Sequence, residues 1–177
     1  MLLRWTGIPD ARILGDADGL PANTQLAADM RGRAEHCLRK LNRIAKGDEA
    51  EPFGWDAASA ARLDEVCDRI LLTRPDAGTI EQASAEIGSY LGELIVRNSA
   101  SWWVYDADAE AAGVVTVWRH RFFPHSRVGK RLAHGRRQPH IPFLLALAST
   151  HSLRVFYETI VSGRMPPDAK ITPRDAP

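Results

Sequence analysis

The 177-residue chain has little of what marks several protein classes. It has two cysteines, too few for a disulfide framework. Its longest strongly apolar run, residues 141–148, is far shorter than the roughly 20 residues that a membrane-spanning helix needs. The amino-terminal segment contains Arg4 and Asp10 and has no apolar stretch of signal-peptide type. We therefore expect a cytoplasmic protein with no membrane part, in which Cys37 and Cys67 are reduced and buried.

Motifs of familiar enzymes and metal sites are also absent. The sequence contains no Gly-x-Ser-x-Gly elbow, no phosphate-binding loop and no dinucleotide-binding fingerprint. The histidines at 120, 125, 134, 140 and 151 form no His-x-x-x-His pair and have no neighbouring cysteine or carboxylate to complete a metal site. Asp16, Asp18 and Gly19 match only a fragment of a calcium loop, so we interpret them as a turn. The sequence predicts no metal and no cofactor.

Negative charge is missing from one long stretch of an otherwise balanced chain. Residues 111–157 contain eight Lys and Arg side chains and no Asp or Glu, whereas residues 1–110 contain 12 basic and 19 acidic side chains. The net charge of the whole chain is only +1. A basic region of this kind attracts phosphates or acidic proteins, although it does not identify a reaction.

The basic stretch supplies the predicted binding residues. They are Arg119, Arg121, Arg127, Lys130, Arg131, Arg136 and Arg137. The leading hypothesis is a non-enzymatic interaction module whose basic face, residues 119–137, engages an acidic protein partner or is neutralised by its own acidic region, within one chain or in a homo-oligomer. Trp118, Phe122 and Phe123 lie among these cations, and such a mixture is typical of single-strand nucleic-acid surfaces. A nucleic-acid or phosphate-ligand binding protein is the alternative.

Helical periodicity dominates the first hundred residues. Apolar side chains recur at three- and four-residue steps in segments that predict helices over about 24–47, 56–72 and 79–98. On the first helix this apolar stripe includes Ile44, which we expect to be buried. Thr79 and Gln82 have capping-box spacing and predict the start of the third helix.

An extended pattern follows the third helix. Aromatic and β-branched residues predict a hairpin at about 101–118, formed by strands 101–105 and 114–118. Residues 119–123 extend the second strand or begin a third. Since a lone hairpin is marginal in water, further strands are expected near residues 2–5 or 12–14.

The second half then returns to helices. A short basic helix is predicted over 126–134, ending at Gly135, and a last helix over about 142–162. These elements predict a helix-rich α+β fold, with helices packed on a small antiparallel sheet. One domain is expected over residues 1–163, followed by an extended or disordered tail over 164–177 that is rich in proline.

The third helix carries a stripe of small residues and three candidate catalytic side chains. Ser84, Gly88 and Gly92 recur every fourth residue, and we interpret this groove as a close packing site for another backbone. Beside it lie Tyr90, Glu93 and Arg97, of which the last two have the spacing of a helical ion pair. An enzyme of unfamiliar type with a site at these three residues is a further alternative. We expect Glu86 and Glu93 to lie on a solvated helix face.

Three segments carry a resemblance to a group of small proteins. The segments are IGSYLGELIVRNSASWWV at 87–104, FFPHSRVGKRLAHG at 122–135 and SLRVFYE at 152–158. Together they resemble a group of small uncharacterised bacterial proteins, common in actinobacteria, with a Gly-x-Tyr-Leu-Gly-Glu helix, a tryptophan strand and a Val-x-Lys-Arg-Leu helix. The resemblance implies an α+β domain. Because the group has no assigned activity, the resemblance implies no catalytic role. This chain differs from that pattern at residues 136–150, which resemble an extension.

Overall fold

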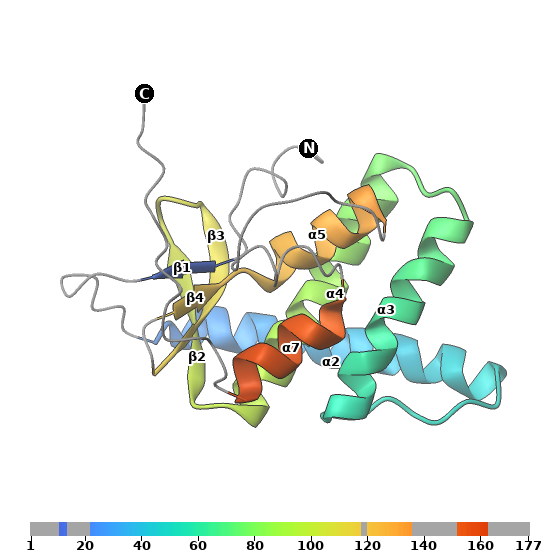
Figure 1. Ribbon diagram of the computed structural model, residues 1–177, viewed down its shortest axis with the longest axis horizontal. Helices are drawn as coiled ribbons and strands as arrows, with labels where there is room; N and C mark the ends of the chain where they lie inside the picture. The colour runs from blue at the N-terminus through green and yellow to red at the C-terminus, as the bar shows by residue number, and fades with distance from the viewer. Residues whose placement is uncertain (1–10, 14–21, 118–119, 136–151, 163–177) are drawn as a thin grey trace.

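The described part of the chain combines five helices with one four-stranded sheet (Figure 1). This computed structural model describes residues 11–13, 22–117, 120–135 and 152–162. The helices are α2 (Thr24–Gly47), α3 (Ala57–Leu72), α4 (Ala77–Asn98), α5 (Pro124–His134) and α7 (Leu153–Ser162). The strands are β1 (Ala11–Ile13), β2 (Ser101–Asp106), β3 (Ala111–Thr116) and β4 (His120–Phe122). The predicted helix-rich α+β class is confirmed, and none of the helices described is long and apolar enough to cross a membrane.

Short polar side chains fix where the first three helices begin. Asn23 accepts a hydrogen bond from the backbone N–H of Leu26 at 2.9 Å, and Asp56 accepts one from Ser59 at 2.7 Å, so α2 and α3 begin where the sequence predicts. The predicted start of α4 at Thr79 is wrong. Asp76 accepts a hydrogen bond from the N–H of Thr79 at 2.7 Å and therefore starts the helix at Ala77.

The strands pair in the order β1-β4-β3-β2, each antiparallel to its neighbour. The predicted hairpin is confirmed, with Ser101 opposite Thr116. Its second strand begins at Ala111 rather than at residue 114, because three small residues continue the ladder towards the turn. Both additional strands also form, β4 within the predicted 119–123 and β1 near the predicted 12–14. The other candidate, residues 2–5, lies outside the described residues.

Helix α4 lies at the centre of the fold and packs against α2, α5 and the sheet (Figure 1). Its small residues allow this close packing. A Cβ atom on Gly88 would lie 2.6 Å from the Cα of His125, and one on Gly92 would overlap the ring of Trp103. The interpretation of this stripe as a packing site is therefore confirmed.

The second half of the chain differs from the prediction mainly at its helix boundaries. Helix α5 begins at Pro124 instead of residue 126, since proline suits the first turn, and it ends before Gly135, whose φ is 64°. Helix α7 covers the carboxyl-terminal half of the predicted 142–162 helix. Residues 142–151 and the predicted tail at 164–177 lie outside the described residues.

Candidate functional site

The described arginines of the predicted basic face point into the protein. Arg121, Arg127 and Arg131 are 3%, 2% and 1% exposed, and Lys130 is half-buried. Arg119, Arg136 and Arg137 lie outside the described residues. Arg121, Arg127 and Arg131 therefore do not form an exposed basic face.

Acidic residues from the first 110 positions neutralise two of these buried arginines. Arg121 on β4 forms an ion pair with Asp106 at the end of β2. Arg131 on α5 reaches α3, where its guanidinium lies 2.5 Å from a carboxylate oxygen of Asp68 and 3.4 Å from one of Asp64. A buried arginine needs such partners because an uncompensated charge is costly in a protein interior. At these two positions, basic and acidic side chains that lie far apart in the sequence therefore pair with each other inside the fold.

The aromatic residues of this region also belong to the core. Phe122 and Phe123 are 0% and 1% exposed, and Phe122 packs edge-on against Phe156 of α7, with 5.9 Å between ring centroids. The guanidinium of Arg127 lies 5.7 Å from the centre of the same Phe156 ring. Bases could not stack on rings that are buried in this way. Trp118 lies outside the described residues.

Tyr90, Glu93 and Arg97 form parts of a polar network that fixes the fold. Glu93 is buried and accepts hydrogen bonds from Arg97 at 2.9 Å and from the indole of Trp103 at 3.3 Å. Arg97 lies over the ring of Trp55, 3.9 Å from its centroid. Tyr90 donates a hydrogen bond to the carbonyl of Gly54, and burial raises the pKa of its phenol.

The prediction of a solvated face for Glu86 and Glu93 is wrong for one of the two. Glu93 is 2% exposed, because it lies where α4 meets the sheet and receives the Trp103 indole. Glu86 is 23% exposed and bonds the ammonium group of Lys40 at 2.6 Å. The two carboxylates therefore have separate hydrogen-bond partners.

The sequence patterns do not predict one pair of a nucleophile and a base, Ser89 and His125. The hydroxyl of Ser89 on α4 lies 3.0 Å from Nε2 of His125 on α5, and both residues are buried. Burial, with a smaller contribution from the charge of Arg33, lowers the pKa of His125 to about 4. Thirty-six positions separate the pair and no motif connects them. Neither residue lines the cavity described next, so a substrate in that cavity would not reach them.

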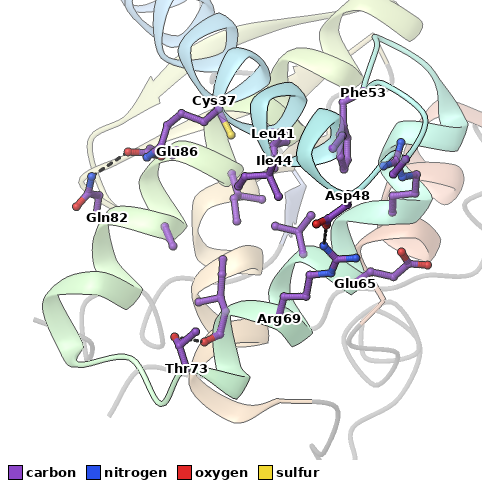
Figure 2. Close-up of a pocket in the computed structure, with 18 of the residues that line it drawn as sticks. Cys37, Leu41, Ile44, Asp48, Phe53, Glu65, Arg69, Thr73, Gln82 and Glu86 are labelled. Carbon is purple, nitrogen blue, oxygen red and sulfur yellow. Dashed lines mark hydrogen bonds and ion pairs between the residues drawn. The ribbon is translucent and has the colours of Figure 1, made fainter.

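A cavity of about 440 Å³ opens between α2, α3 and α4 (Figure 2). Small-molecule sites usually measure about 300–1,000 Å³ and are mainly apolar. Its walls come from all three helices and from the loop that joins α2 to α3, and they are mostly aliphatic. The apolar lining consists of Cys37, Leu41, Ile44, Ala45, Ala50, Phe53, Val66, Ile70, Ala83 and Ile87.

Charged side chains at the edge of the cavity are largely paired with each other. Lys40 of α2 bonds Glu86 of α4. Arg69 of α3 bonds Asp48, the residue that ends α2 (Figure 2). These two ion pairs connect α2 to both neighbouring helices. They leave the interior of the cavity apolar.

The sequence contains one signal of this cavity, the apolar residue Ile44. It continues the apolar stripe of α2, but the prediction that it is buried is wrong, because Ile44 is 56% exposed at the cavity. The stripe is wider than the surface that the described part of the fold covers. An apolar helix face that packing does not fill is a feature of binding sites.

Metal binding and known relatives add no further assignment. Within the described ranges, no group of three or more His, Cys, Asp or Glu side chains is placed to hold a metal ion. Comparisons of the chain with protein-family models, with curated proteins and with solved structures find no match.

Proposed function

We propose that this chain is a non-enzymatic binding protein, and that its site is the cavity between α2, α3 and α4. The observation that carries the proposal is the apolar lining of a 440 Å³ cavity whose deeper wall includes the buried residues Leu41 and Ile87. Apolar surface that stays accessible to solvent costs free energy, and a bound apolar molecule recovers it. The ligand is therefore small and mainly apolar.

The chemistry of the lining favours binding over catalysis. Glu86 and Asp48 are held in ion pairs, and burial raises the pKa of the Cys37 thiol to about 12. A thiol with that pKa is almost entirely protonated at neutral pH and is a poor nucleophile. The cavity thus offers apolar contact without an activated group.

The hypotheses of an acidic protein partner and of nucleic-acid binding have less support. Both need exposed cations, and Arg121, Arg127 and Arg131 are buried. A site at Tyr90, Glu93 and Arg97 also has less support, since each side chain is engaged within the fold.

Binding of the neutral, apolar dye Nile red tests the proposal. The dye should bind with increased fluorescence, and Ala83→Trp should abolish the increase because the indole fills the cavity from α4. Ala28→Trp, on an exposed position of α2 outside the cavity, is the matched control and should bind like the wild type. Thermal melts must show that both variants are folded. Equal dye binding by a folded Ala83→Trp variant would place the site elsewhere.

A further inference from the structure

We infer that the ligand of this cavity is an anionic amphiphile, an alkyl chain with one carboxylate, whose head group is bound by Arg62. The inference rests on the proposed function and adds the chemical class of the ligand. It rests on a difference between Arg62 and the other two cations of the cavity lining, Lys40 and Arg69, which both form ion pairs.

Arg62 is fixed in the cavity wall by contacts to an aromatic ring and to a backbone carbonyl. Its charge also acts on Asp56, where it is the smallest of the causes that lower the pKa of that carboxyl. Its guanidinium stacks on the ring of Phe53, 4.0 Å from the centroid, and its Nη1 donates a hydrogen bond to the carbonyl of Glu51 at 2.6 Å. Both Arg62 and Phe53 line the cavity. Within the described ranges no carboxylate forms an ion pair with Arg62, and the guanidinium has N–H groups beyond those on Nη1.

The other cations at the cavity already have anionic partners. Lys40 lies 2.6 Å from the carboxylate of Glu86, and Arg69 pairs with Asp48. A ligand carboxylate would have to displace those partners, whereas at Arg62 it adds a charge-assisted hydrogen bond. Arg62 is therefore the binding group for an anionic head, with the apolar lining left for the chain.

One carboxylate of the cavity lining, Glu65, would suit a cationic head group instead. Glu65 lies three residues after Arg62 on α3 and also lines the cavity. Its side chain is exposed and makes no hydrogen bond or ion pair to the described residues, so water solvates it well. A cation held in place on an aromatic ring needs less ordering on binding than a solvated carboxylate, which favours an anionic ligand.

Three ligands with alkyl chains of nearly equal length test the inference. Dodecanoate, dodecanol and dodecyltrimethylammonium differ mainly in the head group, and each is titrated below its micelle or solubility limit as a competitor of Nile red on the full chain. Dodecanoate should bind at least about tenfold more tightly than dodecanol, since a hydrogen bond to a charged group is typically worth that much. Tighter binding of dodecyltrimethylammonium would overturn the inference and identify Glu65 as the head-group site.

Equal affinities, or displacement by none of the three while Nile red still binds, would also overturn the inference and leave the proposed function standing. Failure of Nile red itself would instead remove the proposed function. The two results are therefore distinguishable.

A pair of charge variants locates the head group. Arg62→Gln should reduce the preference for dodecanoate over dodecanol to about twofold or less, mainly through a loss of dodecanoate affinity. Arg43→Gln removes the same charge from an exposed position of α2 outside the cavity and should keep the wild-type preference. If both variants keep that preference, Arg62 does not bind the head group. If Arg62→Gln does not fold, the wild-type head-group series still decides for or against an anionic ligand.

Discussion

Gly88 of α4 lies directly against the backbone of His125 in α5. A Cβ atom added to this glycine would be 2.6 Å from the Cα of His125 and 2.7 Å from Cδ2 of its ring. Backbone atoms cannot move aside as the end of a flexible side chain can. The close approach of the two helices therefore depends on the missing side chain.

Gly88→Ala should destabilise the protein although alanine is the better helix former. Overpacking typically costs about 1–3 kcal/mol, and the gain in helix propensity is only about 1 kcal/mol. A urea titration followed by circular dichroism measures the difference in the free energy of unfolding. Gly32→Ala on α2 is the matched control, since nothing lies within 4 Å of its added Cβ, and it should stabilise the protein slightly. A stabilised Gly88→Ala variant would contradict the observed contact.

His125 should make stability fall as the pH drops below neutral. Burial lowers its pKa to about 4 in the folded protein, whereas an unfolded histidine has a pKa of about 6.5. Between these values the unfolded state binds the extra proton, so the contribution is complete above pH 6.5 and is lost as the pH falls towards 4. The expected loss is about 3 kcal/mol.

Urea titrations at several pH values between 4 and 7 measure this loss. His125→Gln, which has no group that titrates in this range, should show a much flatter dependence, even if it is less stable at neutral pH. His120, whose pKa burial also lowers, contributes in the same direction, so a small slope should remain. An unchanged slope in His125→Gln would show that another group causes the dependence.

The sequence predicted the elements of this fold better than their contacts. Asn23 and Asp56 have short-range roles as helix caps, so their neighbours alone indicate them. The same local reasoning failed at Thr79, because the structure uses Asp76, which follows Pro75, as the cap.

The candidate site depends on distant contacts that local patterns do not encode. Arg131 donates hydrogen bonds to Asp64 and Asp68, which lie more than sixty positions earlier in the sequence, and no spacing rule predicts such a contact. The cavity arises because α3 leaves part of the α2 stripe uncovered, and the exposed Ile44 was therefore indistinguishable from a core residue in the sequence. A charge count identified the arginines but not whether they face solvent.

Asp64 should contribute more to stability than any exposed acidic residue. Its carboxylate accepts hydrogen bonds from the N–H of Leu153 at 2.9 Å and the hydroxyl of Ser152 at 2.8 Å, and it also faces the buried Arg131. It thus holds the start of α7 and compensates a charge inside the fold. Asp64→Ala should lower the free energy of unfolding by about 3 kcal/mol.

A surface ion pair provides the comparison for this variant. Glu158 and Arg154 lie on α7 with both side chains more than half exposed, 3.8 Å apart. Glu158→Ala should change the free energy of unfolding by less than about 1 kcal/mol. Chemical denaturation of the two variants in parallel decides, and equal effects would show that Asp64 acts only as a surface charge.

The two cysteines should react slowly with thiol reagents in the folded protein. Burial raises the pKa of both thiols to about 12, and only the thiolate attacks. Labelling with a maleimide at neutral pH, followed by mass spectrometry, should be on the order of a hundredfold slower than in urea. Cys37 should be the faster of the two, because it lines the cavity while Cys67 does not. The single variants Cys37→Ser and Cys67→Ser assign each rate. Labelling of Cys37 as fast in the folded as in the unfolded protein would contradict its burial.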